Sequence, residues 1–183
     1  MSPRSTERSE PVSPSKFAHV VLRTKRFPEL LAWWRTLLQP ATVFENDFIA
    51  FLTYDDEHHR LAIARMPGLE EPPDRSVGVD HIAYTYGSLG DLLHTYERLK
   101  SGGIEPYWCI NHGPTTSMYF RDPDGNQVEL QHDNFSTAQE LDEFFSGGAF
   151  ARNPVGVEYD PEKLLGKYQA GVPLDELVRQ GSA

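Results

Sequence analysis

The sequence predicts an α+β fold in which two βαβββ modules follow one another and enclose a shared cleft, with a helical tail behind them. Two observations predict this fold. Strand-like and helix-like runs occur twice in the same order, and a histidine opens each repeat. Shifting the first half by 62 residues lays His19 on His81 and Leu30-Leu31 on Leu92-Leu93, and a shift of 67 lays Ala62 on Glu129.

The first module, residues 16–66, is expected to contain strand 17–24, helix 28–38 and strands 41–46, 48–54 and 59–65. Apolar residues recur on one face of the helical run: Leu30, Leu31, Trp34, Leu37 and Leu38. Pro40 cannot continue a helix and therefore marks its end.

The second module, residues 78–135, repeats the order with strand 79–86, helix 88–100 and strands near 104–110, 115–121 and 127–132. Gly102-Gly103 is a helix stop. The last two strands are joined by Asp122-Pro123-Asp124-Gly125, a tight-turn sequence in which proline presets the turn and glycine tolerates positive φ.

Three segments lie outside the repeats. Residues 1–15 are rich in Ser, Pro and charge, so we expect a flexible leader. A loop with Pro67, Pro72 and Pro73 separates the modules. Residues 136–183 form a helical C-terminal extension, with helices expected at 137–145, at 160–168 behind the Asp160-Pro161 cap, and at 173–179. This extension has an apolar face that would pack on the domain, cover the cleft or contact a second subunit in a homodimer.

Composition excludes several classes of function. The chain has 183 residues and a net charge of -10, which disfavours nucleic acid and anionic membrane surfaces as partners. It has neither an apolar run of about 20 residues nor an apolar signal core, so we expect a cytoplasmic protein. Cys109 is the single cysteine and lies between Trp108 and Ile110, which indicates a buried thiol rather than a nucleophile.

His19, His81 and Glu129 are the candidate metal ligands. Most lone histidines in strands are ordinary core or surface residues, and we assign no role to His94 or His132. His19 and His81 differ because they occupy the same repeat position among apolar neighbours, where each buried imidazole needs a partner. Two histidines and one carboxylate form the facial ligand set that suits Fe(II) and leaves three positions open. Ala62, at the position matching Glu129, cannot be a fourth ligand.

Strand-initial His19 and His81, together with the run from Tyr119 to Glu129 (YFRDPDGNQVE), resemble the vicinal oxygen chelate superfamily over residues 17–135. This superfamily includes glyoxalase I, bleomycin and fosfomycin resistance proteins, and type I extradiol dioxygenases. The resemblance implies a βαβββ repeat and a divalent-metal site made of His19, His81 and Glu129. Ala62 argues against the four-ligand glyoxalase site.

Three further matches resemble extradiol dioxygenases. His59, in the segment HHRLAIA, matches the acid-base histidine. Strand alternation from Ala62 would point His59 outward and His58 inward, unless a bulge near 55–57 changes the direction of the pair. His58 is therefore the substitute for His59. His112, followed by Gly113, matches a histidine that contacts the substrate, and Tyr119 matches an active-site tyrosine. Phe44, Phe51, Tyr107 and Trp108 are candidate pocket walls, although packing is the commoner role of such residues.

The resemblance therefore implies an extradiol ring-cleaving dioxygenase that uses Fe(II), with Mn(II) as the alternative ion, on a catechol-type, biphenyl-diol-like aromatic and O2. Two other functions remain open. One is a vicinal oxygen chelate isomerase or lyase with another divalent metal, which would act without O2. The other is a non-catalytic protein that binds a small molecule and confers resistance.

Overall fold

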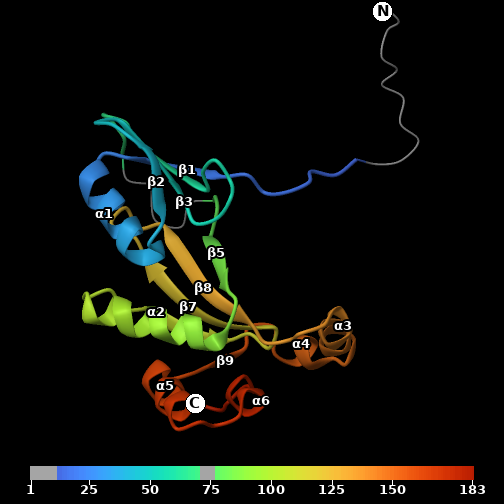
Figure 1. Cartoon of the computed structure of the whole chain (residues 1–183). Helices are drawn as coiled ribbons and strands as arrows, with labels where there is room; N and C mark the ends of the chain where they lie inside the picture. Colours follow the sequence, from blue (N-terminus) through green and yellow to red (C-terminus); the bar gives the residue numbers. More distant parts are fainter. Residues whose placement is uncertain (1–11, 71–76) are drawn as a thin grey trace, which may run out of the picture.

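The structure, a computed structural model, describes residues 12–70 and 77–183 and has two sheets, each covered by a helix (Figure 1). The predicted α+β fold with two βαβββ modules is confirmed. Residues 1–11 of the predicted leader and 71–76 of the inter-module loop lie outside the described residues. Residues 12–15 are exposed and form neither helix nor strand.

The first sheet has the strand order β1-β4-β3-β2. Its elements are β1 (Val20–Thr24), α1 (Phe27–Leu38), β2 (Ala41–Glu45), β3 (Ile49–Thr53) and β4 (Leu61–Arg65). Helix α1 ends where Gln39 adopts a left-handed conformation with φ of 48°, directly before Pro40. The expected first strand is too long, because β1 begins at Val20 and leaves His19 just outside it.

The second sheet has the order β5-β8-β7-β6-β9. Its module contains β5 (His81–Tyr86), α2 (Leu89–Ser101), β6 (Trp108–Asn111), β7 (Thr115–Arg121) and β8 (Gln127–Asp133). Helix α2 ends at Gly102 as expected. The turn between β7 and β8 is also confirmed: the Gly125 N–H donates to the Asp122 carbonyl over 2.9 Å, and Gly125 has φ of 85°.

Strand register confirms the internal repeat at the position that matters for the site. Strand β1 pairs with β4 in parallel, with Val21 opposite Ala62. Strand β5 pairs with β8 in parallel, with Ala83 opposite Glu129. Val21 and Ala83 each lie two residues after the repeat histidine, so Ala62 and Glu129 occupy equivalent places. Alanine cannot bind a cation there.

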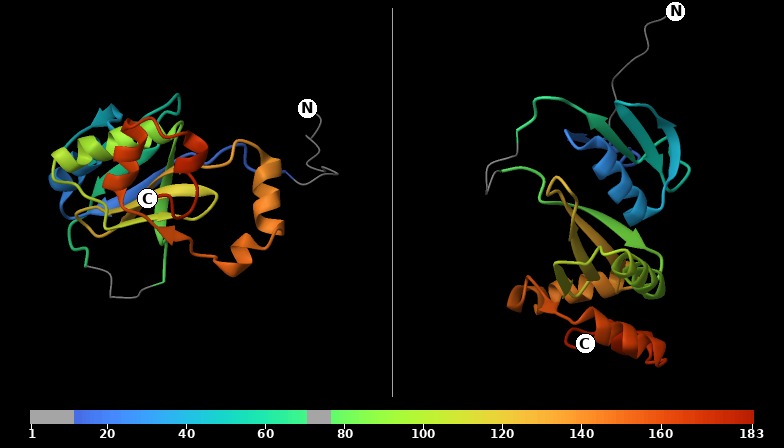
Figure 2. Two further views of the ribbon diagram at one scale, coloured as in Figure 1. Left: turned by 90° about the horizontal axis from the view of Figure 1, so that it is seen from below. Right: turned by 90° about the vertical axis from the view of Figure 1, so that its left-hand side faces the viewer.

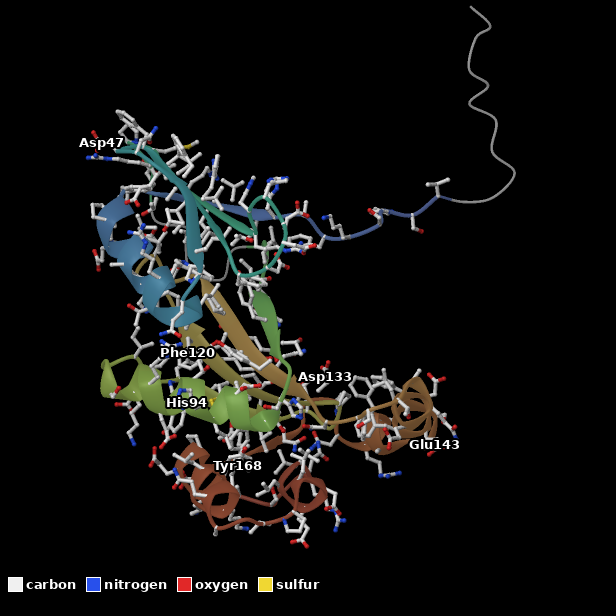
Figure 3. All side chains as sticks on the ribbon, viewed as in Figure 1. Asp47, His94, Phe120, Asp133, Glu143 and Tyr168 are labelled. Carbon is white, nitrogen blue, oxygen red and sulfur yellow. The ribbon has the colours of Figure 1, made fainter. Side chains whose placement is uncertain are left out.

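One hydrophobic cluster contains residues of both modules. The apolar stripes of α1 and α2 supply its buried leucines, and Trp34 and Phe120 are among its largest fully buried side chains (Figure 3). His94 lies on the exposed side of α2, as expected for a solvated residue. Because both modules share this cluster, neither can rotate freely about the cleft.

Helix α1 of the first module is also tied to the β7–β8 turn of the second. The Trp34 indole N–H donates to Asp122 Oδ2 over 3.1 Å in the interior. Arg26 Nη1 donates to the Pro123 carbonyl and to Asp124 Oδ1 over 2.9 and 2.8 Å. Asp122 also accepts from the backbone N–H groups of Asp124 and Asn126. The turn therefore fixes the orientation of the two modules as well as the register of its hairpin.

Replacing Asp122 by alanine is expected to destabilise the protein by roughly 3 kcal/mol, because each buried donor left unpaired costs about 1–3 kcal/mol. Urea unfolding measures the change. Asp133→Ala, at the exposed end of β8, is the matched control and should change stability by less than about 0.5 kcal/mol. Equal losses in the two variants would contradict the role given to Asp122.

The C-terminal extension contains α3 (Ala138–Ser146), α4 (Ala149–Arg152), β9 (Val157–Glu158), α5 (Pro161–Gln169) and α6 (Leu174–Leu177). The three expected helices are confirmed, whereas α4 and β9 were not predicted. Helix α5 packs against α2, where a Cβ on Gly90 would stand 2.2 Å from the Tyr168 hydroxyl (Figure 3). Figure 2 shows α3 and α4 standing away from both sheets. Among the described helices, none has the length and apolar character required to cross a bilayer.

Candidate metal centre and active site

His81 and Glu129 are brought together by the parallel pairing of β5 and β8. His81 Nε2 lies 3.0 Å from Glu129 Oε2, and the Glu129 side chain is 6 % exposed. The other imidazole nitrogen, His81 Nδ1, lies 2.8 Å from Asp80 Oδ2. A carboxylate in that place orients the ring and holds its proton on Nδ1.

This pair fits a divalent cation. With its proton on Nδ1, a neutral His81 turns a lone pair of Nε2 toward a carboxylate oxygen, so two electron-pair donors face one another. An ion between them relieves that repulsion. Two ligand atoms about 2.1 Å from an ion and at a right angle to it are about 3.0 Å apart, which is the separation found here. An imidazolium would also satisfy the pair, but its Nε2 would carry a proton and have no lone pair for a metal.

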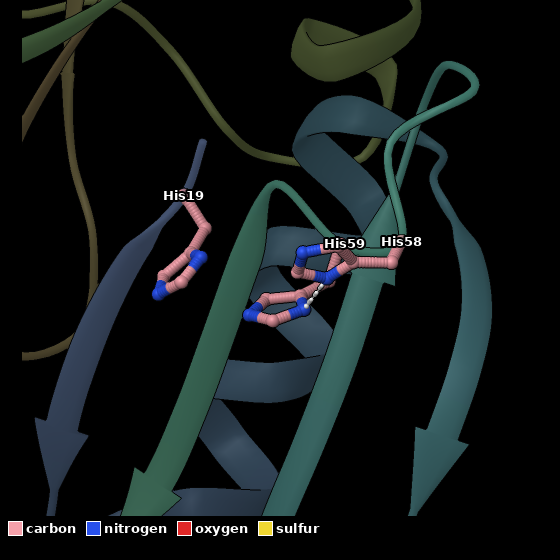
Figure 4. A group of neighbouring side chains, drawn as sticks. All are labelled: His19, His58 and His59. Carbon is pink, nitrogen blue, oxygen red and sulfur yellow. Dashed lines mark hydrogen bonds between the residues drawn. The ribbon is translucent and has the colours of Figure 1, made fainter. Parts of the chain in front are cut away.

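His19, His58 and His59 form a second cluster, on the first sheet (Figure 4). One potential ligand atom from each lies within 4.8 Å of the others, and among the described residues this is the single group of three or more such side chains that meets this distance. The ring of His19 stacks on that of His59 with centroids 4.3 Å apart. The backbone before His19 is held by Arg60, whose Nη1 donates to the Ala18 carbonyl over 3.1 Å.

The structure therefore brings two of the three predicted ligands into contact and places the third in a neighbouring cluster. His81 and Glu129 make a close pair, whereas the exposed ring of His19 is turned toward His59. The three-ligand set stays a prediction. Asp80 was missed by the sequence reasoning, although an acidic residue next to a candidate ligand histidine was a signal available in the sequence.

The strand-alternation argument about His58 and His59 does not apply, because β4 begins only at Leu61. The preceding segment is a bent loop. The Thr53 hydroxyl donates to the Glu57 carbonyl over 2.9 Å, and the Glu57 N–H donates to Asp55 Oδ1 over 3.1 Å. This loop, rather than a bulge in a strand, sets the orientation of His58 and His59.

His59 is the more sheltered histidine of the pair. It is partly buried and stacks on Phe51 with centroids 4.6 Å apart, whereas His58 is exposed. Partial burial, followed by the neighbouring His19 and His58, lowers the pKa of His59 below its ordinary value. A lowered pKa keeps the imidazole neutral and able to accept a proton at neutral pH.

His112 and Tyr119 lie together beside Glu129. His112 Nε2 is 3.0 Å from the Tyr119 hydroxyl, and Tyr119 faces Glu129 across the β7–β8 pair. The Tyr119 ring packs edge-on against His81 at 5.3 Å. Burial first, and then the negative charge of Glu129, raise the pKa of Tyr119 above its ordinary value. The phenol therefore stays protonated and is a hydrogen-bond donor in the site.

Aromatic rings continue outward from both clusters. On the first sheet, Phe44 lies 5.9 Å from Phe51, and both are accessible on the face that carries His59. On the second sheet, Trp108 packs on Tyr119 with centroids 4.9 Å apart. Phe44, Phe51 and Trp108 thus adjoin proposed site residues, and their role as pocket walls stays a prediction.

An open hollow of about 860 Å³ separates β1 from β5, the edge strands of the two sheets. Its lining includes Val20 and Val21 from β1 and His81 from β5, but not His59 or Tyr119. The two edge strands do not pair with each other, so backbone hydrogen bonds do not close the space between the two groups of site residues.

Cys109 and His132, which were predicted to have no catalytic role, lie outside the site. Cys109 is buried, and burial raises the pKa of its thiol to about 12, so it is not a nucleophile at neutral pH. His132 lies three residues after Glu129 in β8 and therefore faces the other side of the sheet, where its Nδ1 is 3.4 Å from the Tyr86 carbonyl.

Comparison with known proteins identifies relatives over most of the chain. Residues 16–130 match the family described as Glyoxalase/Bleomycin resistance protein/Dioxygenase superfamily. The chain is 48% identical over 164 residues to biphenyl-2,3-diol 1,2-dioxygenase 2 of Rhodococcus globerulus, covering 89% of this chain and 86% of the relative. It is 42% identical over 170 residues to biphenyl-2,3-diol 1,2-dioxygenase 3 of the same organism, covering 92% and 90%.

The fold is shared more widely than the sequence. The crystal structure of lactoylglutathione lyase from Agrobacterium tumefaciens superimposes with a TM-score of 0.53 at 19% identity. That match covers 65% of this chain and 94% of the other. At this identity the likeness establishes the βαβββ repeat and leaves the chemistry to the site residues.

Proposed function

Since the chain belongs to the Glyoxalase/Bleomycin resistance protein/Dioxygenase superfamily and is an extradiol dioxygenase, we propose that it opens the ring of a catechol-type, biphenyl-diol-like aromatic with O2, using Fe(II) held by His19, His81 and Glu129. The observation that carries the proposal is the 3.0 Å His81–Glu129 pair beside Tyr119. Ala62 at the place matching Glu129 keeps the ligand set at three, which leaves room for the diol and for O2.

His19 supplies the third ligand in this proposal. Its ring is exposed, and exposed side chains exchange rotamers within picoseconds to nanoseconds, so its stacking on His59 does not hold it permanently away from the ion. Val20, the next residue, lines the same hollow as His81. The proposed movement is a rotation of the His19 side chain toward this hollow.

Bound Fe(II) would supply Lewis-acid activation of the diol and a common point of attachment for diol and O2. His59 accepts a proton from a diol hydroxyl and later returns it, because its lowered pKa keeps the ring neutral near pH 7. Stacking on Phe51 limits the positions that the His59 ring can adopt.

Tyr119 and His112 hold the substrate oxygens from the opposite side. The Tyr119 hydroxyl stays protonated, and when the diol binds its single proton turns from His112 Nε2 toward a negatively charged diol oxygen. His112 contacts that hydroxyl through Nε2 and so limits its direction. The Tyr119 donor acts on charge that develops during ring opening, where a preorganised donor has its largest effect.

The aromatic faces beside the site favour a substrate with more than one ring. Phe44 is 47% exposed and packs near Phe51, which adjoins a proposed catalytic group. Tyr107 is 45% exposed and packs near Tyr119, itself a proposed catalytic group. Large accessible rings gain free energy when an aromatic group covers them. A bicyclic diol of the biphenyl type covers more of this surface than catechol itself.

The test is to load the metal-free protein with Fe(II) under anaerobic conditions, add monocyclic and bicyclic catechols, and admit O2. We expect equal consumption of O2 and diol, with a yellow ring-fission product, and a higher kcat/KM for the bicyclic diols. Mn(II) loaded in parallel distinguishes the two candidate ions. Turnover without O2 would instead indicate an isomerase or lyase. Tight binding of the diols without any turnover would indicate a binding protein.

A further inference from the structure

The C-terminal extension reaches the candidate active site through β9. Strand β9 pairs antiparallel with β6, with Asn111 opposite Val157 and Ile110 opposite Glu158. The Trp108 indole N–H donates to Glu158 Oε1 over 2.8 Å. Buried leucines of α5 and α6 anchor the segments that follow. The extension thus contributes an edge strand, β9, to the sheet that carries His81, Tyr119 and Glu129.

The comparisons separate this extension from the shared fold. The match to the superfamily ends at residue 130, and the lactoylglutathione lyase structure aligns almost whole with 65% of this chain. The two dioxygenases align over 164 and 170 residues, lengths that require most of residues 136–183 to be included. Most of the extension is therefore shared with the two dioxygenases, but it lies outside the match to the superfamily.

Both ring nitrogens of His112 have partners, and one partner belongs to the extension. His112 Nδ1 contacts the Val155 carbonyl, and Nε2 lies 3.0 Å from the Tyr119 hydroxyl. A carbonyl oxygen can only accept, so the proton of a neutral His112 must be on Nδ1. Nε2 then carries a lone pair that faces the Tyr119 hydroxyl. The one proton of that hydroxyl has two acceptors within reach, His112 Nε2 and the Glu129 carboxylate.

We infer that the C-terminal extension is a positioning element of the active site: the Val155 carbonyl fixes His112 in the Nδ1–H tautomer, with Nε2 facing Tyr119. The catalytic importance of this contact rests on the proposed function, in which Tyr119 and His112 hold the substrate oxygens. Without the carbonyl, the ring could turn over or protonate on Nε2. Tyr119 would then lose one of its two acceptors, and its hydroxyl would face an N–H instead of a lone pair.

Local structure explains how this carbonyl is held. Asn153 closes a turn on Gly156, with its Oδ1 accepting from the Gly156 N–H over 3.0 Å and its Nδ2 donating to the Gly156 carbonyl over 2.7 Å. Gly156 has φ of 116°, and a Cβ there would stand 2.3 Å from the Asn111 carbonyl oxygen and 2.8 Å from His112 Cα. Only glycine allows Val155 to approach His112 so closely.

Gly156→Ala is expected to displace the Val155 carbonyl and lower kcat about 10- to 100-fold. Gly171→Ala is the matched control, since Gly171 also has positive φ, at 78°, but its added Cβ would meet nothing within 4 Å. Asn153→Ala loosens the same turn without introducing a Cβ at Gly156, and should lower kcat in the same direction by a smaller factor. Near-ultraviolet circular dichroism reports whether each variant is folded.

The decisive readout is the protonation site of His112, measured by ¹⁵N NMR on the full chain with labelled histidine and diamagnetic Zn(II). His112→Gln assigns the resonance by its disappearance. We expect Nδ1–H in the parent protein and in Gly171→Ala, and a shift toward Nε2–H in Gly156→Ala and Asn153→Ala. If Gly156→Ala does not fold, Asn153→Ala alone decides. A parent protein protonated on Nε2, or folded variants with the parent tautomer, would overturn the inference. The tautomer is measured without turnover, so this outcome is independent of the proposed reaction.

Discussion

Glu129→Ala is expected to bind Fe(II) more than about 100-fold more weakly than the parent chain and to lose ring cleavage at ordinary iron concentrations. Partners outside the ligand set typically contribute 10–100-fold to metal affinity, so loss of a ligand should cost more. The carboxylate is buried 3.0 Å from His81, and alanine offers no atom in its place. Iron content after desalting, and a titration of the metal-free protein with Fe(II), measure the loss.

Gln131→Ala is the matched control for this change. Gln131 lies two residues further along β8, on the same face as Glu129, and its amide donates to Thr85 and Asp133 rather than to any proposed ligand. Its replacement should leave iron binding within about threefold of the parent value. Full iron occupancy in Glu129→Ala would show that the ion is held elsewhere. The His19, His58 and His59 cluster would then be the first candidate.

His59→Ala is expected to lower kcat by about 10²- to 10⁴-fold while iron is retained, because a positioned acid-base group contributes about that factor. His58→Ala serves as the paired comparison. The side chain of His58 is 66% exposed, and we expect its loss to cost less than about tenfold. Iron content must be measured with kcat, since both residues adjoin the proposed ligand His19. A larger loss in His58→Ala would reverse the assignment of the base.

The pH profile tests the same residue. Burial and the two neighbouring histidines lower the pKa of His59, so its neutral, proton-accepting form persists to lower pH than that of an ordinary histidine. The acidic limb of kcat/KM should therefore lie below about pH 6.5 and should disappear in His59→Ala. An acidic limb above that value would contradict the lowered pKa or the role of His59 as base.

Local sequence signals predicted most of the fold because each acts over a few residues. The spacing of Leu30, Trp34 and Leu37 defines the buried face of α1, and Asp160 caps α5 directly before Pro161. Strand β9 has no comparable signal. It contains two residues and exists because it pairs with β6, a contact between residues 46 to 48 positions apart in the chain.

The same distinction between local signals and contacts of distant segments applies to the site residues. The repeat indicated His81 and Glu129 as candidates, and the family resemblance added Tyr119. Strand pairing brings these three close together. The loop of residues 54–60 could not be predicted from alternation, since side-chain hydrogen bonds of Thr53 and Asp55 replace the strand there. The contact of Val155 with His112 uses a backbone carbonyl, which every residue has and no side-chain pattern marks.

The sequence by itself determined the α+β repeat, the candidate ligands and the absence of a fourth ligand at Ala62. These features depend on residue type and on spacing within one element or one repeat. Only the tertiary structure decided that His19 stacks on His59, that Asp122 joins the two modules through Trp34, and that the extension contacts His112. Each of these depends on side-chain conformation or on packing between distant segments, which local patterns do not encode.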